Sequence, residues 1–326
     1  MTHEESLYFS AKKERRLDLY ASGPSSIYRD AIGRFEDRFP GIEVNLTNGY
    51  AGTLASSIDA QRKAGAVEAD LALLQSIQDF ERWRNDGHLE PFEPPGLERI
   101  LPSFKAPDGT WVGTQVYGIV YAYRSDVLDA DSVPRSALDF LDCRFDGKMI
   151  SGAPHRDDVV LYLYYTLVEK YGWSFMDRLM KNRPTFVEGH APLARALVEG
   201  DFTVTLDAIP WLCLADKRRG AKVDMYISDE DAMPIWAQTA GIFRGARHPC
   251  AAKLFLSWYL SQEQQASMAR DGTWSPRDDV PPPESLRPLT HYKLADGFRE
   301  FITNERLVCE LRERFQSYIE PSATPR

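Results

Sequence analysis

The sequence lacks a surplus of positive charge and any long apolar run. Its 39 Lys and Arg residues stand against 48 Asp and Glu residues, so the formal net charge is −9. Nucleic acid or an anionic membrane surface is therefore not expected as a partner, because no cationic excess exists to release counterions. The longest apolar stretch, residues 159–168, is too short to span a bilayer and is typical of a buried helix. We expect no direct membrane insertion.

The sequence also lacks the common signatures of metal, disulfide and catalytic chemistry. Its four cysteines show neither a C-x-x-C pair nor a histidine at ligand spacing: Cys143, Cys213, Cys250 and Cys309. This scatter predicts four buried thiols rather than a disulfide framework or a metal site. No G-x-S-x-G, H-E-x-x-H, P-loop or Cys–His motif is present. We therefore expect no enzymatic activity, no cofactor and no metal.

Residues 1–20 contain no apolar core of a signal peptide. The protein is then either cytosolic or a mature form whose leader has been removed. Composition alone leaves both possibilities open.

What the sequence does contain is an alternation of strand-like and helix-like segments. At 326 residues the chain suits two lobes better than one core. In the first part of the chain, strands are predicted at 17–22, 42–48 and 69–76, and helices at 27–39, 54–63 and 77–87. This alternation predicts a parallel, doubly wound α/β sheet. A long apolar strand at 114–123 precedes a second strand–helix series, which ends near residue 227.

The segment RHPCAAKLFLSWYLSQEQQASMARDGTWSPRDD, residues 247–279, predicts two helices followed by a turn. Pro249 suits a first helical turn, and an apolar stripe follows it at helical spacing. Ser261 and Gln264 form a capping-box pattern that ends the first helix and begins the second. Gly272 predicts the end of the second helix, and Ser275-Pro276 then directs the chain into an extended conformation.

Taken in order, these segments resemble the type II periplasmic (extracellular) solute-binding proteins of ABC importers, in the branch of ferric-iron, sugar-phosphate and aminoethylphosphonate binders. The resemblance runs from Ser6 to about Leu289. It is carried by SLYFSAKKERRLDLYASGP, DGHLEPF, WVGTQVYGIVYAYRSDVL, FDGKMISGAP, AAKLFLSWYLSQEQQ and GTWSPR. It implies two doubly wound α/β lobes joined by a two-crossing hinge, with the ligand cleft between them.

The resemblance also implies where the lobes begin and end. The two crossings are expected near residues 114–121 and 235–243. Lobe one would then comprise residues 1–115 and 240–326, and lobe two residues 116–239. The turn Trp274-Ser275-Pro276-Arg277 is expected near the hinge side of the cleft.

In open α/β sheets, ligands bind beyond the carboxyl ends of strands, beside helix N-termini. In lobe one this rule selects Ser22, Gly23, Ser25, Ser26, Tyr50, Gly52, Thr53 and Gln75. The hydroxyl and N–H groups of the first loop, which also contains Pro24, suit a carboxylate or phosphate. The alternative for its serines, and for Gln75 and Ser76, is helix capping. Tyr50 favours ligand contact over core packing, because loops run over the surface.

In lobe two and the implied crossings, the candidate contacts are Tyr117, His155, Arg156, Asp157, Asp207, Trp211, Trp236 and Gln238. Arg156 precedes a predicted helix, where a guanidinium suits bidentate capture of an oxyanion. The alternative is a solvated surface arginine. Asp157 is the natural N-cap of that helix. Trp211 and Trp236 offer flat apolar walls, with core packing as the alternative.

The chain departs from the ferric-iron binders of this branch. Those proteins carry adjacent tyrosines on the segment that corresponds to residues 206–209, which reads Leu-Asp-Ala-Ile here. The pair Tyr164-Tyr165 lies in an apolar helix and is expected in the core. Ferric iron is therefore disfavoured as the ligand.

The resemblance implies the substrate-binding component of an ABC-type importer, which captures a small polar solute by lobe closure. An anion is favoured, whether phosphorylated, phosphonate or carboxylate. The expected partners are this solute and the permease subunits of the importer, and the chain is expected to be a monomer. The alternatives are a ferric-iron-binding protein of the same fold, or an intracellular enzyme or sensor built on it. The expected location is the periplasm, or the cytoplasm if the native protein has no signal peptide.

Overall fold

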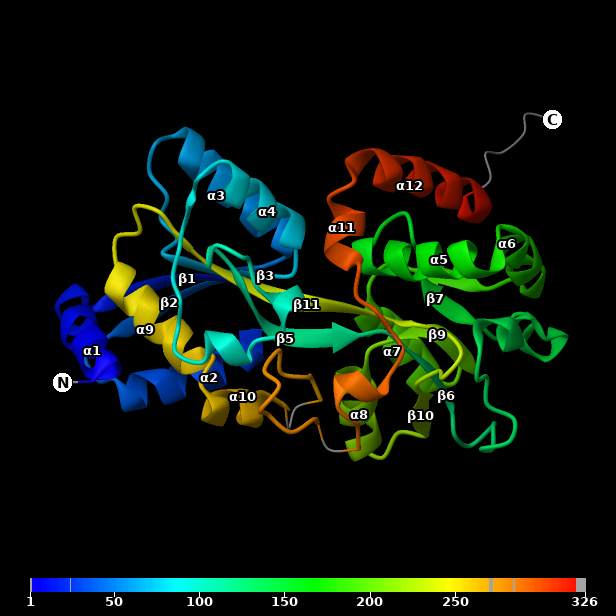
Figure 1. The fold of residues 1–326 in the computed structure, drawn as a ribbon. Coiled ribbons are helices and arrows are strands. Elements are labelled where there is room, and N and C mark those ends of the chain that lie inside the picture. The colour runs from blue at the N-terminus through cyan, green and yellow to red at the C-terminus, as the bar shows by residue number, and fades with distance from the viewer. Residues whose placement is uncertain (1, 24, 270–271, 284, 321–326) are drawn as a thin grey trace. The chain divides into compact units, whose positions relative to one another are not determined.

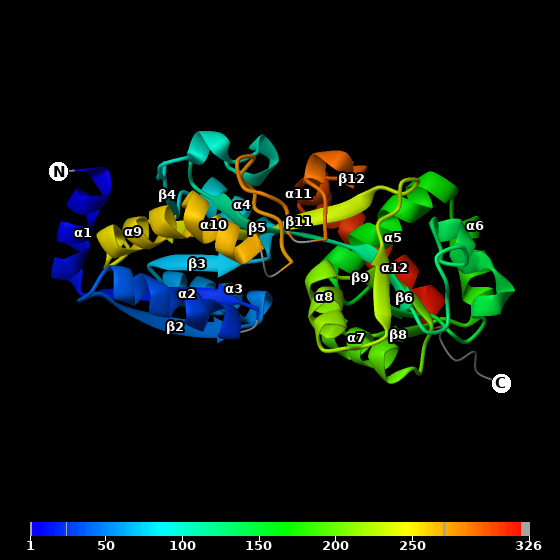
Figure 2. The same ribbon diagram turned by 90° about the horizontal axis from the view of Figure 1, so that it is seen from below.

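The computed structural model describes residues 2–23, 25–269, 272–283 and 285–320. The chain divides into two compact α/β units (Figures 1 and 2). Unit 1 comprises Met1–Val116, Ala237–Arg270 and Trp274–Pro282, and unit 2 comprises Tyr117–Trp236, Asp271–Thr273 and Pro283–Arg326. Within the described ranges, no helix combines the length and the apolar character that a membrane span requires.

Unit 1 is built on one mixed sheet. Its elements begin with α1 (His3–Glu14), β1 (Arg16–Ser22), α2 (Ser25–Arg38), β2 (Glu43–Gly49), α3 (Ala51–Lys63), β3 (Leu71–Leu74), α4 (Ile77–Asn85) and β4 (Leu89–Glu90). They continue with 3₁₀ turns at Leu97–Arg99 and Pro102–Phe104, β5 (Val112–Gly118), β11 (Met233–Phe243), α9 (Pro249–Tyr259) and α10 (Gln262–Ala269). The last two residues of β5 and the first four of β11 lie in unit 2.

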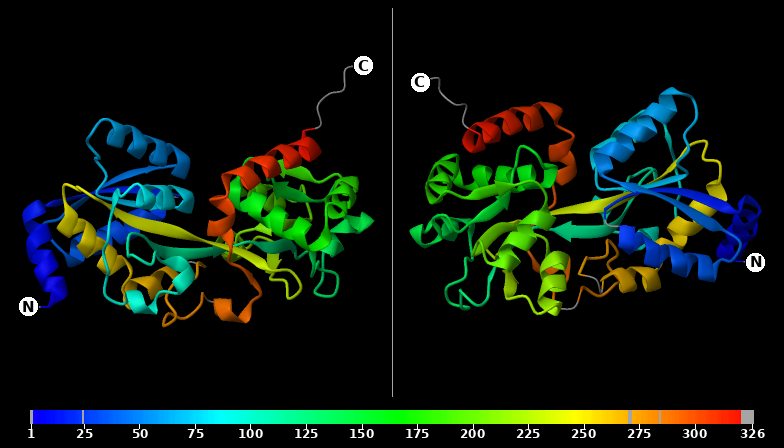
Figure 3. Two further views of the ribbon diagram at one scale, coloured as in Figure 1. Left: turned by 45° about the horizontal axis from the view of Figure 1, so that its top comes forward. Right: turned by 180° about the vertical axis from the view of Figure 1, so that it is seen from behind.

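The strand order β11-β3-β1-β2 sets the edge at which the loops of unit 1 meet. Strands β1, β2 and β3 are parallel, with Ser22 opposite Gly49 and Ala21 opposite Leu73. Their carboxyl ends therefore lie at one edge, whereas β11 runs antiparallel to β3. Helices α3 and α4 cover one face of this sheet and α2 and α9 the other (Figures 1 and 3). Because both faces are covered, every residue of β3 is buried.

The predicted helix pair after residue 247 is present. Pro249 is the first residue of α9, and the N–H of Gln264 donates to Ser261 Oγ over 3.3 Å at the start of α10. Helix α9 packs against α1, α2 and β1. Within this contact, the rings of Phe255 and Trp258 lie against that of Phe35, with centroids 5.0 and 5.4 Å away.

The turn that follows α10 is tied back to β5 and α9. Trp274 and Val116 exchange two backbone hydrogen bonds of 2.8 and 3.1 Å. The buried guanidinium of Arg277 forms a bidentate pair with Asp279, at 2.8 Å for each bond, and donates to the carbonyl of Leu260 at 3.0 Å. The Trp-Ser-Pro-Arg sequence therefore closes the packing of unit 1.

Unit 2 holds three antiparallel strands and a parallel pair. Its elements are β6 (Val120–Arg124), β7 (Ile150–Gly152), α5 (Asp158–Tyr171), α6 (Ser174–Leu179), β8 (Thr185–Val187), α7 (His190–Glu199), β9 (Val204–Ala208), α8 (Pro210–Arg218), β10 (Val223–Tyr226), β12 (Leu294–Ala295), α11 (Phe298–Ile302) and α12 (Glu305–Ile319). Short 3₁₀ helices lie at Ala137–Leu141, Cys143–Phe145, Met180–Asn182 and Leu289–His291.

In unit 2, β6 pairs antiparallel with both β9 and β10, and β7 pairs parallel with β8. A parallel bridge between Met149 and Val204 joins β7 to β9. The carboxyl ends of β7, β8 and β9 therefore point the same way. The strand predicted at 114–123 is in fact two strands interrupted at Ile119, because β5 pairs with β11 whereas β6 pairs with β9 and β10.

The C-terminal segment is the main correction to the predicted lobes. Pro283–Arg326 belongs to unit 2, whereas the sequence placed the whole of residues 240–326 in lobe one. Aromatic side chains of α11 and α12 pack against α5: the ring of Tyr162 lies 5.0 Å from that of Phe301, and Tyr164 lies 5.7 Å from Phe315. Figure 1 shows α12 along α5. The fully buried Tyr164 is in the core, as predicted, whereas Tyr165 is only half-buried and stacks on the ring of Phe301.

The cysteines are free thiols, but their predicted burial is only partly right. Cys213 is buried and Cys250 half-buried, whereas Cys143 and Cys309 are exposed. Cys309 lies on α12, whose buried positions are Val308, Leu311 and Phe315, so its thiol is on the other side of the helix.

Candidate functional site

The predicted contacts of lobe one gather at the carboxyl ends of β1, β2 and β3. We call this set the unit 1 edge: residues 22, 23, 25, 26, 50, 52, 53, 75, 76 and 238. Ser22 is buried, and its Oγ accepts the N–H of Gln75 at 3.3 Å. Gly23 has φ 107°, a left-handed conformation that favours glycine. Pro24 lies outside the described residues.

Ser25 and Ser26 are the first two residues of α2. Ser26 is exposed and Ser25 half-buried. In the described part of the chain, no hydrogen bond occupies either hydroxyl. Both are therefore available to a ligand, together with the free N–H groups of this first helical turn.

Tyr50 projects from the unit 1 edge, with 88% of its surface exposed. It is the N-cap residue of α3, and its side chain makes no capping hydrogen bond. The helix begins at Ala51 rather than near Leu54, so Gly52 and Thr53 lie in its first turn and not in a loop as predicted. Both remain exposed. An isolated, exposed tyrosine of this kind is available for stacking against a ligand.

Gln238 holds the unit 1 edge together. The register of β11 places it opposite Gln75, and the side chain is fully buried. Its Nε2 donates to the carbonyls of Leu73 at 2.6 Å and Ser22 at 3.3 Å, and to Tyr28 Oη at 3.0 Å. Gln238 belongs to unit 1, although the predicted boundary placed it in lobe two. Its role in the structure is to position Ser22.

Two buried polar atoms at the unit 1 edge have no partner among the described residues. They are Gln238 Oε1 and Ser76 Oγ. Helix capping was the alternative to ligand contact for Ser76, but its side chain makes no capping hydrogen bond to α4. Buried polar atoms in native proteins are normally hydrogen-bonded, so unsatisfied ones indicate a position for water or a ligand.

The predicted contacts of lobe two follow β7 and β9. We call the set of residues 152–157, 190, 207, 211 and 320 the unit 2 edge. Asp157 is the N-cap of α5, as predicted, and its carboxylate accepts the N–H groups of Val159 and Val160 at 2.9 and 3.1 Å. This carboxylate is therefore committed to the helix.

His155 and Arg156 converge on a carboxylate that the sequence did not lead us to expect. Arg156 Nη2 donates to Glu320 Oε1 at 3.0 Å, and His155 Nε2 lies 3.3 Å from the same oxygen. Arg156 Nε donates to His155 Nε2 at 3.2 Å. The hydrogen bond and charge of Arg156 lower the pKa of Glu320. The guanidinium is half-exposed, so the exchange of Glu320 for another carboxylate needs no opening of the core.

Asp207 forms the second charged pair of the unit 2 edge. It is fully buried, and its carboxylate accepts the N–H of Gly152 at 2.8 Å and contacts His190 Nε2 at 2.9 Å. Burial lowers the pKa of a histidine, but the charge and hydrogen bond of Asp207 outweigh it and raise the pKa of His190 to about 9. Asp207 therefore holds a protonated His190 at the first position of α7.

The aromatic candidates lie in two different environments. Trp236 is buried and stacks on the buried Tyr117, with ring centroids 5.4 Å apart. Trp236 Nε1 is a further buried atom without a partner among the described residues. Trp211 is half-buried in the first turn of α8. The core-packing alternative thus describes Tyr117 and Trp236 better than Trp211.

A possible metal-ligating group lies at the opposite edge of the unit 1 sheet. Asp18, Asp70 and His248 bring one ligand atom each within 4.8 Å of the others. The members of this group already bind one another and their neighbours: His248 Nδ1 lies 2.7 Å from Asp70, and Arg16 pairs with Asp18 at 2.6 Å. Asp70 also accepts the backbone N–H groups of Asp18 at 2.8 Å and His248 at 2.9 Å, so both carboxylates are engaged within the protein and the group is best described as structural.

Two residues of the unit 2 edge were missed by the sequence. His190 lies just beyond β8, at the start of α7, so the strand-end rule could have found it. Glu320 is separated from Arg156 by 164 residues, and no local sequence pattern predicts their contact.

Comparison with known proteins shows the family and the fold of the chain. A family model for bacterial extracellular solute-binding proteins matches residues 20–266. The chain belongs to this family. A probable ABC transporter periplasmic-binding protein, y4fP of Sinorhizobium fredii, is 25% identical over 241 residues, which are 70% of this chain and 65% of that protein.

Solved structures show the same fold at low identity. The periplasmic binding protein AfuA from Actinobacillus pleuropneumoniae, solved with fructose-6-phosphate, is 19% identical with a TM-score of 0.76, over 94% of this chain and 99% of its own. Iron-bound HitA from Pseudomonas aeruginosa is 20% identical with a TM-score of 0.76, over 92% and 99%. The fold is therefore that of the type II periplasmic binding proteins, as the sequence motifs predicted. These two neighbours hold chemically different ligands, so the fold alone does not select one.

Proposed function

We propose that the chain is the substrate-binding component of an ABC-type importer and captures a small anionic solute by lobe closure. Membership of the extracellular solute-binding family supports a binding role. The name of the Sinorhizobium relative supports the link to an ABC transporter. The permease subunits of the importer are then its protein partners, and the periplasm is its location.

The observation that carries the anionic class is the carboxylate of Glu320 against His155 and Arg156. It supports a site for oxyanions because the guanidinium of Arg156 already donates to a carboxylate oxygen, with the imidazole of His155 beside both. The N-terminus of α5 adds a favourable field for negative charge, although Asp157 takes up part of it. A ligand carboxylate or phosphate would take the place of Glu320.

Ferric iron is not the solute we propose. The segment that corresponds to the tyrosine ligands of iron binders contains Asp207, which is committed to His190. Tyr164 is committed to the core, where its hydroxyl lies 3.0 Å from Ser151 Oγ. Neither arrangement offers the adjacent phenolates that the sequence comparison associates with iron.

Two measurements test this function. Mass spectrometry of molecules released by denaturing freshly purified protein should identify a bound anion. In a thermal-shift screen, each phosphorylated or carboxylated compound is paired with its neutral parent. At a hundredfold excess over its dissociation constant, a ligand of the folded state adds about 2.7 kcal/mol of stability. Stabilisation by neutral sugars or cationic amines alone would show that the anionic class is wrong.

A further inference from the structure

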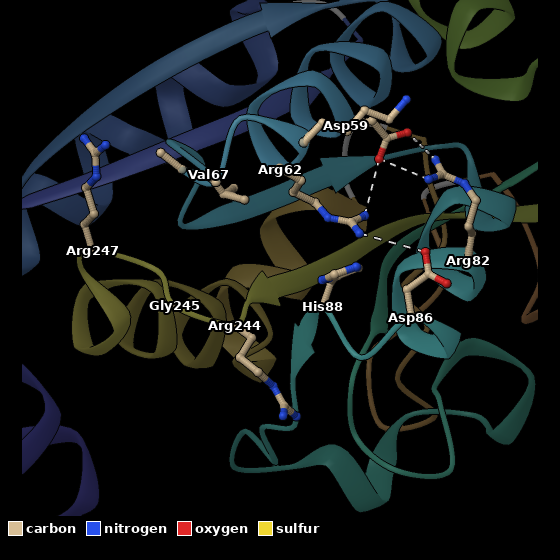
Figure 4. A pocket seen from close by; sticks show the side chains of 12 residues that line it. Asp59, Arg62, Val67, Arg82, Asp86, His88, Arg244, Gly245 and Arg247 are labelled. Carbon is tan, nitrogen blue, oxygen red and sulfur yellow. Dashed lines mark hydrogen bonds and ion pairs between the residues drawn. The ribbon is translucent and has the colours of Figure 1, made fainter.

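Unit 1 contains a cavity at the edge opposite the unit 1 edge. Its volume is about 660 Å³, which lies within the range of small-molecule sites. Three segments line it: the end of α3 with the loop to residue 67, the end of α4 with His88, and the loop 244–247 after β11. These segments meet because β11 is antiparallel to β3, so that Ile242 lies opposite Leu71. We call this cavity the basic pocket (Figure 4).

The lining of the basic pocket is cationic although the chain is acidic. Five basic side chains face two acidic ones: Arg62, Lys63, Arg82, Arg244 and Arg247 against Asp59 and Asp86. Asp59 is already engaged by Arg82 at 2.7 Å and by Trp83 Nε1 at 2.8 Å. In a protein with a net charge of −9, such a local excess of positive charge is a specific feature of this surface.

Arg62 is the central side chain of the basic pocket and is only loosely held. Its side chain is 15% exposed, and its guanidinium lies 3.4 Å from Asp59 and 3.9 Å from Asp86. Its Nε is buried and has no partner among the described residues. Figure 4 shows the guanidinium between these two carboxylates. A buried cationic N–H without an acceptor is costly, and an oxyanion would satisfy it.

Arg82 is paired with Asp59 and Asp79, whereas three further cations of the lining have no such partner among the residues that the structure describes. Within the described ranges, the side chains of Lys63, Arg244 and Arg247 form no ion pair or hydrogen bond. All three are exposed. In Figure 4, Arg247 lies across the basic pocket from Arg82. Long, unpaired side chains on both sides of one cavity can close on a ligand that carries several negative charges.

We propose that the basic pocket binds a small oxyanion that carries at least two negative charges. Its guanidinium groups supply planar pairs of donors, which match phosphate and carboxylate oxygens. This site shares no residue with the unit 1 edge or the unit 2 edge, so it is a second anion site beyond that of the proposed function. Both phosphate and dicarboxylate chemistry fit it, and the experiment separates them.

The test is isothermal titration of the full chain with inorganic pyrophosphate, and separately with succinate, at about 0.15 M salt, where distant charges are screened. The double substitution Arg244→Ser/Arg247→Ser should weaken pyrophosphate binding at least tenfold, and Arg62→Gln should weaken it by a similar factor. Arg178→Ser/Arg218→Ser, at exposed positions of unit 2, removes the same charge elsewhere and should leave binding unchanged. Succinate binding would extend the class to dicarboxylates, and its failure would restrict the site to phosphates.

Three results would overturn this proposal: no saturable binding of pyrophosphate, equal losses in the two double variants, or a loss confined to Arg156→Ala. The last result would place the bound anion at the unit 2 edge instead. Conversely, a failure of the proposed transport function would leave the effect of Arg244→Ser/Arg247→Ser intact. The two proposals can therefore fail separately.

Discussion

The unit 1 edge and the unit 2 edge occupy equivalent places in their sheets but differ in their chemistry. The unit 1 edge consists of hydroxyl, amide and glycine residues, with the exposed Tyr50, and no acidic residue lies in the first turn of α2 or α3. The unit 2 edge carries two ionised contacts, His190 with Asp207 and Arg156 with Glu320. The unit 1 edge therefore offers neutral hydrogen-bonding groups and the ring of Tyr50, whereas the unit 2 edge offers charged side chains.

This difference suggests a division of labour in recognition. Neutral donors orient a ligand but discriminate weakly between charge states, whereas a guanidinium strongly favours an anion. At the unit 2 edge Glu320 already satisfies Arg156, so an anion bound there as proposed would replace one partner by another. We therefore infer that unit 2 sets the charge preference and that unit 1 sets shape and orientation.

The largest expected effect concerns the buried pair of the unit 2 edge. His190→Ala leaves the fully buried Asp207 carboxylate without its cation, and such a loss costs about 3–5 kcal/mol of unfolding free energy. Urea unfolding measures the cost. The double variant His190→Ala/Asp207→Asn should recover part of it, because no unpaired charge remains. If His190→Ala lowers the unfolding free energy by less than about 1 kcal/mol, the claim that His190 and Asp207 form a buried charged pair is wrong.

The same pair predicts how stability depends on pH. The folded-state pKa of His190, about 9, lies above its ordinary value of 6.5. Its stabilisation is therefore complete below about pH 6.5 and is lost as the pH rises through about 9. The increase in the pKa of His190 from 6.5 to about 9 corresponds to about 3 kcal/mol of unfolding free energy, since one pKa unit is about 1.4 kcal/mol.

Urea unfolding of the wild type and of His190→Gln between about pH 6 and pH 10 isolates this contribution, because other groups titrate equally in both proteins. The difference in stability between them should shrink as the pH rises. A constant difference across the range would contradict the raised pKa.

A smaller effect is expected at the neutral edge. Gln238→Met keeps the side-chain length but removes the donor to the carbonyls of Leu73 and Ser22, at a cost of about 1–3 kcal/mol. Because this residue positions Ser22 and carries no charge, the preference for anions over neutral analogues should stay the same. Calorimetric titration with a charged ligand and its neutral parent checks this, and an altered preference would show that unit 1 also sets charge selectivity.

Much of the fold was predictable because it follows local patterns. The alternating strands and helices, the Asp157 cap and the α9–α10 pair come from periodicity and capping residues, and all are present. The start of α3 was misplaced because Gly52 weakens the local helix signal, whereas the helix already begins at Ala51, after the N-cap Tyr50. Local patterns thus locate elements better than they locate ends.

The parts that were not predictable depend on contacts between distant segments. In α12, Val308, Leu311 and Phe315 form a visible apolar stripe, but nothing in it identifies α5 as its partner. The pairing of Arg156 with Glu320 follows from that docking and was equally invisible. For the candidate site, the sequence identified the loops, and the structure identified which charges in them are already paired.

The measurement that tests the central claim most directly is the ratio of affinities for the released anion and for its neutral analogue in Arg156→Ala. We predict a fall of about ten- to hundredfold in anion affinity, as expected for the loss of a charge-assisted hydrogen bond, with little change for the neutral analogue. Arg156→Lys should recover part of the loss. As the matched control at the unit 1 edge, Ser26→Ala should lower both affinities alike and leave the ratio unchanged. An unchanged ratio in Arg156→Ala, or a collapse of the ratio in Ser26→Ala, would contradict the claim that unit 2 sets the charge preference.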